Sequence, residues 1–393
     1  MNDVKTFCDT YYVDRKQTDS EKWDGLEEKF GQGNLLPLWV ADMDFQIPEK
    51  AREALMERVE HGVFGYSKPS DTYFDAFINW QQKRHGIELK EEWVRFTTGV
   101  VNSFNFIIQA FSQEGDAVLV LPPVYYPFFS AVEKNNRVLI HSELRNDGGA
   151  FTMDFADIEQ KIIAHNIKIL LHCSPHNPVG RVWTRAELTT LFDICQKHGV
   201  LIISDEIHQD FIREGQEFVS ALRLDEKYQE MLFVLTSASK SFNLAGLLHS
   251  HVIIPDEEKR RRFDAHLEKV ANNAQSTMGM IATEACYRYG EEWFDSLQQV
   301  IEHNYQIIRR EAARLLPKAV VSDKQGTYLA WLDLSSYVTE EKMTEMMQER
   351  AQIAIDYGSW FSSNFGQFIR INLATKPENI ELAMTRLADA LTN

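Results

Sequence analysis

Lys240 lies in the stretch Leu235-Thr-Ser-Ala-Ser-Lys-Ser-Phe-Asn-Leu-Ala-Gly246, where a strand-like apolar run ends in small hydroxyl residues beside a single amine. A solvated lysine is protonated at neutral pH, but removal from water can leave the amine neutral and able to attack a carbonyl carbon. Taken alone, such a lysine is more often the solvated end of a strand. The interpretation of Lys240 as a nucleophile therefore depends on the residues upstream.

Two upstream strand ends carry the side chains that a carbonyl cofactor with a pyridine ring needs. The run Val200-Leu-Ile-Ile-Ser-Asp-Glu-Ile-His208 is typical of a buried parallel strand that delivers Asp205 into a crevice at its carboxyl end. An aspartate beside a pyridine nitrogen keeps the ring protonated, and the cationic ring can then stabilise a carbanion. Asn177 follows the apolar residues 167–173 in a proline-fixed turn, where its amide can hydrogen-bond a phenolic oxygen. An Asn-Pro turn alone more simply reverses the chain.

The ordered set Asn177, Asp205 and Lys240 resembles the fold-type I pyridoxal-phosphate enzymes of the aminotransferase class I/II superfamily. In that family a Ser-Pro-x-Asn-Pro asparagine, a strand-end aspartate and a Ser-x-x-Lys lysine follow in the same order, and the last corresponds to Ser237 to Lys240. The resemblance implies pyridoxal 5'-phosphate as the cofactor. It also implies an α/β fold, with a large domain built on a mostly parallel, seven-stranded-type sheet between helices and a smaller α+β domain.

Further segments resemble the C–S lyase branch of this family, the MalY/PatB-type or cystathionine beta-lyase-like enzymes. These segments are Asp14-Arg15 with Thr18–Asp24, the signature segment Leu38-Trp-Val-Ala-Asp-Met-Asp-Phe-Gln-Ile-Pro48, Val63-Phe-Gly-Tyr66, and Ser239–Gly246. Leu248 stands where many aminotransferases carry an arginine that clamps the phosphate, and this branch commonly lacks that arginine. The branch implies a carbon–sulfur beta-lyase that cleaves cystathionine or related cysteine S-conjugates to a thiol, pyruvate and ammonia.

Two other functions stay open at the level of sequence. An aminotransferase uses the same residues and differs in where one proton goes, so the branch resemblance alone favours the lyase. A regulatory protein-binding role with residual lyase activity is the second alternative, and the intact set of site residues speaks against a loss of catalysis.

The pattern along the chain predicts two domains and an N-terminal segment. From residue 97 to residue 237 short apolar runs alternate with amphipathic stretches, as in β-α-β units around a mostly parallel sheet. Within this region Thr184 and Glu187 form a capping box, and Gly199 ends the predicted helix just before the Asp205 strand. We expect residues 1–46 to join the small domain, residues 47–286 to form the large cofactor-binding domain, and residues 287–393 to form the small domain.

The phosphate site is predicted at the stretch Thr97-Thr-Gly-Val-Val-Asn-Ser103, which precedes a helix-length apolar run. Free backbone N–H groups near Gly99, Val100 and Val101 can hold a phosphate at a helix N-terminus. The resemblance adds Ser237 and Ser239 as hydroxyl donors. It also adds Tyr66, which in related enzymes reaches the phosphate from the neighbouring subunit and so implies a homodimer with shared active sites.

The remaining site residues follow from the family pattern. Tyr125 matches the aromatic residue that stacks on the pyridine ring, with Tyr126 as the competitor, and His208 stands where aminotransferases usually have tyrosine near the phenolic oxygen. Arg370 matches the arginine that grips the substrate's α-carboxylate, and backbone groups near Ala41 are expected to touch the same carboxylate. Lys240 is the expected general base, and Lys240 or Tyr66 the proton donor to the leaving sulfur.

Composition limits the partners and the compartment. The 393 residues carry a net charge of −17, which disfavours a surface built for nucleic acid or anionic lipid. The four cysteines have no paired spacing, and no apolar run is long enough to span a bilayer, so we expect a cytoplasmic protein without disulfides. His249 and His251 lack a third metal ligand at suitable spacing, and no metal site is predicted.

Overall fold

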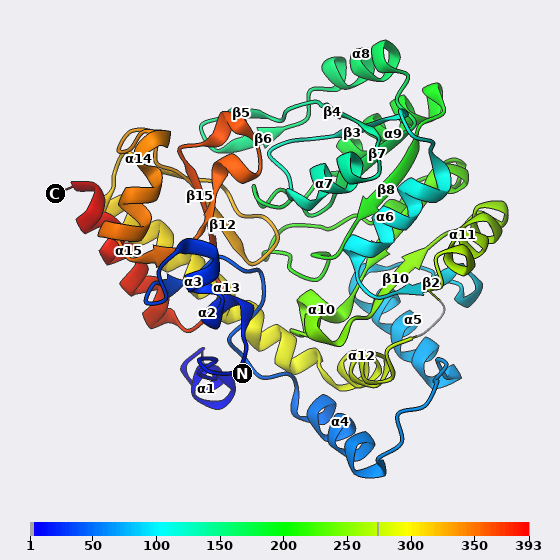
Figure 1. Cartoon of the computed structure of the whole chain (residues 1–393), viewed down its shortest axis with the longest axis horizontal. Helices are drawn as coiled ribbons and strands as arrows, with labels where there is room; N and C mark the ends of the chain where they lie inside the picture. Colours follow the sequence, from blue (N-terminus) through cyan, green and yellow to red (C-terminus); the bar gives the residue numbers. More distant parts are fainter. Residues whose placement is uncertain (1–3, 273–274, 393) are drawn as a thin grey trace.

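A seven-stranded sheet forms the centre of the larger lobe in the computed structural model, which describes residues 4–272 and 275–392 (Figure 1). Its strands follow in the spatial order β2 (Val94–Thr97), β10 (Ser250–Ile253), β9 (Leu232–Thr236), β8 (Leu201–Asp205), β7 (Ile169–Cys173), β3 (Ala117–Val120) and β4 (Val138–His141). Strand β10 runs antiparallel to both of its neighbours, whereas β9, β8, β7, β3 and β4 pair in parallel. The predicted α/β fold with a mostly parallel seven-stranded sheet is confirmed.

Successive residues of each central strand pack toward opposite faces of this sheet, so the strands are apolar on both sides. On β8, for example, Ile203 packs with one group of helices and Ile202 with the other. The first face is covered by α6 (Val100–Phe111), α7 (Pro127–Lys134) and α11 (Glu257–Lys269). The second face is covered by α5 (Asp71–His85), α8 (Phe155–His165) and α9 (Arg185–His198).

The unit formed by α9 and β8 follows the local signals in its sequence. The Thr184 hydroxyl accepts a hydrogen bond from the backbone N–H of Glu187, and the Glu187 carboxylate accepts one from the Thr184 N–H, which completes the predicted capping box. Gly199 ends the helix with a φ of +67°, a left-handed conformation that favours glycine. Strand β8 starts two residues later, and its register with β7 and β9 places Asp205 opposite Cys173 and Leu235.

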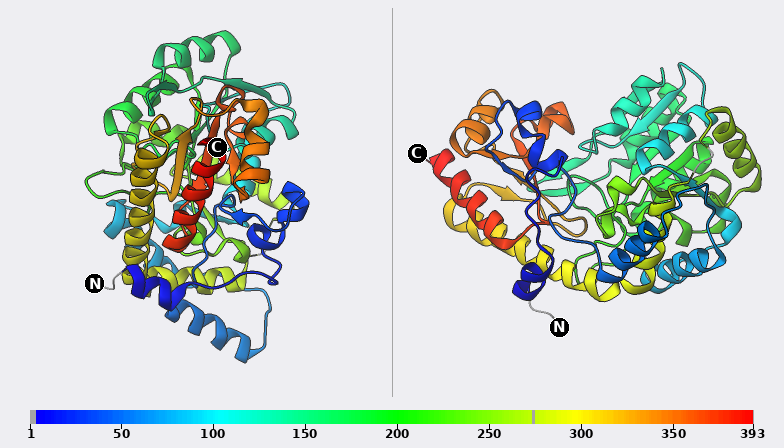
Figure 2. Two further views of the ribbon diagram at one scale, coloured as in Figure 1. Left: turned by 90° about the vertical axis from the view of Figure 1, so that its left-hand side faces the viewer. Right: turned by 60° about the horizontal axis from the view of Figure 1, so that its bottom comes forward.

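The smaller lobe has its own antiparallel sheet, in the order β11 (Val320–Val321), β12 (Leu329–Asp333), β15 (Phe368–Asn372) and β14 (Asp356–Tyr357). The long helix α13 (Glu291–Leu315) packs against the C-terminal helix α15 (Pro377–Thr392) beside this sheet. Near the N-terminus, β1 (Leu36–Pro37) pairs in parallel with β13 (Ile353–Ala354), and Figure 2 shows the N-terminal segment in blue against the orange and red C-terminal elements. The domain boundaries given above remain a prediction.

The remaining helices extend the two lobes: α1 (Val4–Tyr11), α2 (Glu21–Asp24), α3 (Leu26–Phe30), α4 (Glu49–His61), α10 (Ala238–Ser241), α12 (Thr277–Tyr289) and α14 (Glu340–Thr344). Helix α12 packs against α4 and α5, and α10 carries Lys240. No helix in the described ranges is both long and apolar enough to cross a membrane.

Candidate active site

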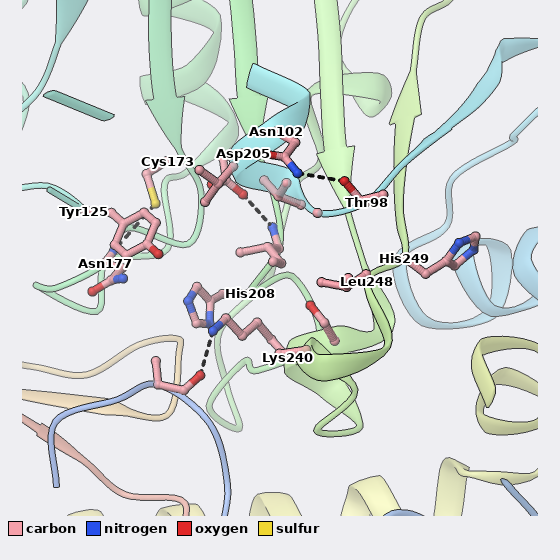
Figure 3. Close-up of a pocket in the computed structure, with 17 residues that line it drawn as sticks. Thr98, Asn102, Tyr125, Cys173, Asn177, Asp205, His208, Lys240, Leu248 and His249 are labelled. Carbon is pink, nitrogen blue, oxygen red and sulfur yellow. Dashed lines mark hydrogen bonds between the residues drawn. The ribbon is translucent and has the colours of Figure 1, made fainter. Parts of the chain in front are cut away.

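Six strands of the large sheet end at the same edge, and residues at or after the ends of five of them line one cavity of about 260 Å³ (Figure 3). Carboxyl ends of parallel strands are where open α/β sheets bind small molecules. Strands β2, β3, β7, β8 and β9 lead into this cavity because β10 alone, within the described residues, reverses direction. Most of the predicted site residues meet here: Ala41, Gly99, Val100, Val101, Tyr125, Asn177, Asp205, His208, Ser239 and Lys240.

One end of the cavity is suited to an anion. Helix α6 begins at Val100, and its first-turn backbone N–H groups point outward without partners inside the helix. Gly99, just before it, has φ of +157° and ψ of +152°, a conformation that is essentially restricted to glycine. The Asn102 amide donates to the Thr98 hydroxyl at 2.7 Å and fixes the rim of this end. A phosphate group fits this helix N-terminus.

Asp205 provides a buried carboxylate that lacks a full counter-charge. Its side chain is 3% exposed, and its Oδ1 atom accepts a hydrogen bond of 3.1 Å from the Ile207 N–H. Burial raises the pKa of Asp205 to about 7, although the Ile207 N–H and the charge of Lys240 oppose the shift. A protonated ring nitrogen would supply the missing positive partner, so the residue fits a pyridinium.

Lys240 is the third residue of the short helix α10, which follows β9, and its side chain lines the cavity. Its Nζ atom donates a hydrogen bond of 2.6 Å to the carbonyl oxygen of Ala41 (Figure 3). Removal from bulk water lowers the pKa of Lys240 to about 8, against the opposing charges of Asp42 and Asp205. A large fraction of this amine is therefore neutral near pH 8, which a nucleophile or a general base requires.

The signature segment is held in place by polar groups from both lobes. Each carbonyl oxygen from Trp39 to Met43 accepts at least one side-chain hydrogen bond: Trp39 from Arg370, Val40 and Asp42 from Asn372, Ala41 from Lys240 and Tyr328, and Met43 from Asn243 and Arg15. Buried backbone carbonyls need such partners, so these side chains give the segment a single conformation over the cavity. The branch signature is thus a structural bridge between the lysine helix and the small lobe.

Two ion pairs explain why the entry segment accompanies this signature. Arg15 binds both carboxylate oxygens of Asp42, at 2.8 and 2.7 Å. Lys22 and Asp44 form a pair of 2.8 Å in which both side chains are fully buried, and the Trp23 indole donates to the same carboxylate at 2.9 Å. Buried charges need such pairing, so the segment around Arg15 and Lys22 is matched to the two aspartates of the signature.

Arg370 lies behind Asn177, outside the set of residues that line the cavity. Its Nη1 atom donates to Asn177 Oδ1 at 3.0 Å, and its Nη2 atom donates to the Trp39 carbonyl at 3.0 Å and to the Asp356 carboxylate. Burial raises the pKa of Asp356 to about 6, with Arg370 opposing the shift. The role of Arg370 in binding a substrate carboxylate remains a prediction.

Two predicted cofactor residues do not line the cavity of their own chain. The Ser237 hydroxyl is buried, donates to the His249 carbonyl at 2.7 Å and caps α10 by accepting from the Ser239 N–H at 3.0 Å. Tyr66 lies on the extended segment between α4 and α5, and its side chain is fully exposed. The Ser237 hydroxyl is thus occupied within its own chain, whereas the predicted phosphate contact of Tyr66 requires a neighbouring subunit.

The structure distinguishes Tyr125 from Tyr126 and shows the surroundings of His249 and His251. Tyr125 lines the cavity, whereas Tyr126 packs against Trp360 and the neighbouring phenylalanine of the small lobe. His249 and His251 are both buried, and each imidazole Nε2 contacts the hydroxyl of the α5 tyrosine, at 2.6 and 2.5 Å. The His249 ring points away from the cavity (Figure 3). Across residues 4–272 and 275–392, no group of three or more potential ligands could hold a metal ion.

Sequence reasoning missed several residues of the site. Thr98, Asn102, Cys173, Ile207 and Ala245 line the cavity, and Tyr328 donates to the Ala41 carbonyl at 2.7 Å. The positions of Thr98 and Asn102 beside Gly99 could have suggested the first two. No pattern in the sequence signals Tyr328, because its contact joins residues that are 287 positions apart.

The chain belongs to the aminotransferase class I and II family, whose family model matches residues 34–387. It is 37% identical to cystathionine beta-lyase PatB of Bacillus subtilis (strain 168) over 380 residues, which cover 96% of this chain and 98% of PatB. The structure is similar to that of cystalysin from Treponema denticola, which contains a pyridoxal 5'-phosphate cofactor, with a TM-score of 0.93, 35% identity, and coverage of 96% of this chain and 97% of cystalysin. A pyridoxal-phosphate-bound C–S lyase from Staphylococcus hominis has a TM-score of 0.91 and 31% identity, and the match covers 97% of each chain. The resemblance to this family that the motifs indicated is confirmed.

Proposed function

We propose that this protein is a pyridoxal 5'-phosphate-dependent carbon–sulfur beta-lyase that cleaves cystathionine or related cysteine S-conjugates. The observation that carries the proposal is the cavity that joins the Lys240 amine, the Asp205 carboxylate and the α6 N-terminus. These three groups match the aldehyde, the ring nitrogen and the phosphate of the cofactor. The similarity to PatB and to the C–S lyase of Staphylococcus hominis supports the choice of reaction.

When bound, pyridoxal phosphate supplies an aldehyde that combines with amines and a ring that accepts negative charge from a substrate's α-carbon. The N–H groups of Val100 and Val101 would hold the phosphate, and Tyr125 would cover the ring and exclude water. Asp205 would keep a proton on the ring nitrogen, and Asn177 and His208 would be available to hydrogen-bond the phenolic oxygen. All six of these residues line the cavity.

The freed Lys240 amine removes the α-proton of the amino acid and, as an ammonium, is retained by the Ala41 carbonyl. The Cβ–S bond then breaks, and the departing sulfur takes the electron pair of that bond together with a proton from Lys240 or Tyr66. Addition of one water to the remaining three-carbon fragment releases pyruvate and ammonia. No oxidant or reductant is required.

A direct assay tests this proposal. The purified protein, loaded with pyridoxal phosphate and given cystathionine without any 2-oxo acid, should release thiol and pyruvate in equal amounts. An aminotransferase uses the same residues and belongs to the same family, but it would release neither product and would turn over only when a 2-oxo acid is added. Turnover of that second kind would replace the lyase with the aminotransferase.

We further propose that the protein works as a homodimer in which Tyr66 of the partner subunit completes each cavity. The extended segment that carries Tyr66 projects from the large lobe after α4 (Figure 1), and it exposes the large apolar side chains Val63 and Phe64. Val101 and Leu248 are exposed apolar residues at the cavity itself. A second copy of the chain would cover both sets. A monomer with full activity would contradict this proposal.

We propose a cytoplasmic location from the unpaired cysteines. The four thiols form no disulfide, and three of them are buried.

Cys173 lines the cavity, but it is not proposed as a nucleophile. Burial raises the pKa of its thiol, so the reactive thiolate form is disfavoured.

A further inference from the structure

Arg370 and Asp356 lie directly opposite each other on the antiparallel strands β15 and β14. Directly opposite residues of such strands project to the same face, and here the two side chains form an ion pair between Nη2 and Oδ2. The exposed fractions of the side chains are 3% and 2%, so little solvent screens the pair. The positive charge of Arg370 is therefore matched by a charge that belongs to the protein itself.

The hydrogen bonding of this pair is incomplete. Within residues 4–272 and 275–392, neither the Nε atom of Arg370 nor the Oδ1 atom of Asp356 has a hydrogen-bond partner, although both atoms are buried. The contact of Arg370 with Asn177, which lines the cavity, places the guanidinium one residue away from the space for a substrate. The Nε–H of Arg370 is a donor that can bind an incoming carboxylate, whereas Oδ1 of Asp356 is an acceptor that a carboxylate cannot satisfy.

We propose that Asp356 is a positioning residue that neutralises Arg370, so that the site accepts amino acids but binds carboxylates without an amine only weakly. This inference rests on the proposed role of Arg370 in holding the substrate's α-carboxylate. An incoming carboxylate is attracted by Arg370 and repelled by Asp356, and the two effects largely cancel. Asp356 is ionised above its pKa of about 6, so the cancellation operates at neutral pH.

The consequence is selection between classes of ligand. An amino acid is also held through its amine, which Lys240 exchanges for its own, and it tolerates a weak carboxylate contact. A 2-oxo acid or a simple carboxylate has no such second attachment. Pyruvate, the product of the proposed reaction, is therefore released easily, and 2-oxo acids, which amino transfer requires, are disfavoured. Asp356 would in this way favour the lyase over the aminotransferase reaction.

Calorimetric titration with acetate at pH 8 tests this inference on the cofactor-loaded protein. Acetate carries only the carboxylate, so its affinity reports the charge balance at Arg370 without any turnover. We expect Asp356→Asn to bind acetate on the order of tenfold more tightly than the natural protein, because the repelling charge is gone. Asp356→Glu restores the charge and should return the affinity to the natural value, which a purely structural role would not predict. Asp389→Asn, the same change on an exposed residue of α15, is the matched control and should leave the affinity unchanged.

Each other outcome has a defined meaning. Asp356→Ser, which leaves room for water, replaces Asp356→Asn if the latter fails to fold, and the same tightening is expected. An acetate affinity within about twofold of the natural protein in a folded Asp356 variant would overturn the inference. Arg370→Gln should abolish acetate binding, and if it does not, acetate binds elsewhere and the inference also fails. A failure of the proposed lyase function would be seen separately, as absence of thiol release by the natural protein.

Discussion

Two buried aspartates five residues apart, Asp205 and Asp210, show opposite electrostatics. Asp205 faces the cavity, and burial raises its pKa to about 7. Burial would also raise the pKa of Asp210, but hydrogen bonds from His85, Ser241 and Trp80 outweigh it and lower the pKa. Asp205 can still accept a charged partner from a ligand, whereas Asp210 already has its hydrogen-bond donors within the protein. The difference separates a functional acid from a structural one on a single segment of chain.

The Asp210 cluster lies behind the active site and connects three elements. His85 and Trp80 come from α5 and contact the Oδ1 atom at 2.7 and 3.0 Å, whereas Ser241 follows Lys240 on α10 and donates to Oδ2. A buried carboxylate with three donors fixes the helix that carries the reactive lysine. The protein thus keeps Lys240 in place with one acid and supports its chemistry with the other.

The largest expected effect comes from Lys240→Ala, which removes the general base that lines the cavity together with Asp205. We expect lyase turnover to fall by roughly 10⁴-fold, because proton transfer at the α-carbon loses its catalyst. Thiol release from cystathionine measures this loss. Lys324 is a matched control, because burial also lowers its pKa to about 8 although it does not line the cavity. Equal losses in Lys240→Ala and Lys324→Ala would mean that neither lysine is specific to catalysis.

Asp205→Asn should separate function from stability. We expect turnover to fall by roughly 10² to 10³-fold, since the ring nitrogen loses its charged partner. The cofactor-free protein should become more stable at the same time. The folded-state pKa of Asp205, about 7, lies above the ordinary value of 3.8. The folded natural protein therefore holds this proton more tightly than the unfolded chain, and its stability falls as pH rises from about 4 to about 7. Outside this range the Asp205 carboxyl adds no further pH dependence.

Urea unfolding of the cofactor-free forms measures this gain. At pH 8 it should amount to at most roughly 4 kcal/mol in favour of Asp205→Asn, and it should vanish near pH 4. A variant that is less stable than the natural protein at pH 8 would show that Asp205 is a structural acid like Asp210.

Asp210→Ala should have the opposite effects to Asp205→Asn: a large loss of stability and a small loss of turnover. Removal of the carboxylate leaves three buried donors without their acceptor, and we expect the free energy of unfolding to fall by roughly 3 kcal/mol. Turnover of the folded fraction should fall far less than in Asp205→Asn, because Asp210 does not line the cavity. Urea unfolding and turnover per folded molecule, measured on the same variant, show whether Asp210 stabilises the fold or takes part in catalysis. Loss of turnover without loss of stability would remove the distinction between the two aspartates.

The pH dependence of turnover gives the smallest effect. Lys240 acts as a base only when neutral, and its pKa is lowered to about 8, so turnover should rise with pH up to about 8 and level off above it. Below that value we expect about a tenfold loss for each pH unit. Substrate deuterated at the α-carbon should react more slowly if proton removal limits the rate. A profile that still rises above pH 10 would indicate that Lys240 keeps the pKa of a solvated lysine.

The features that could be predicted from the sequence are those set by residues close together in the chain. The capping box at Thr184, the strand that carries Asp205 and the helix after Gly99 are local patterns, and the structure contains all three. The helix starts at Val100, within the stretch whose N–H groups were predicted to hold a phosphate, and its first residue also packs in the core. The order of Asn177, Asp205 and Lys240 was sufficient for the fold and the family.

Contacts between distant segments could not be predicted in this way. The pairing of Asp356 with Arg370 depends on strand register, and the Tyr328 contact with Ala41 depends on how the two lobes meet. The Asp210 cluster likewise joins α5 to the lysine helix over more than 120 residues. Single residues of these sets have no distinctive sequence context, so only the folded arrangement reveals their roles.

The proposed function requires that Lys240, and no other lysine, holds the cofactor beside Asp205. The most direct measurement is to load the protein with pyridoxal phosphate, reduce it with borohydride to make any lysine linkage permanent, and locate the added mass by peptide mass spectrometry. We expect one modified peptide, the one that contains Lys240, with Lys324 unmodified. A label on Lys324 or another lysine, or no label at all, would contradict it.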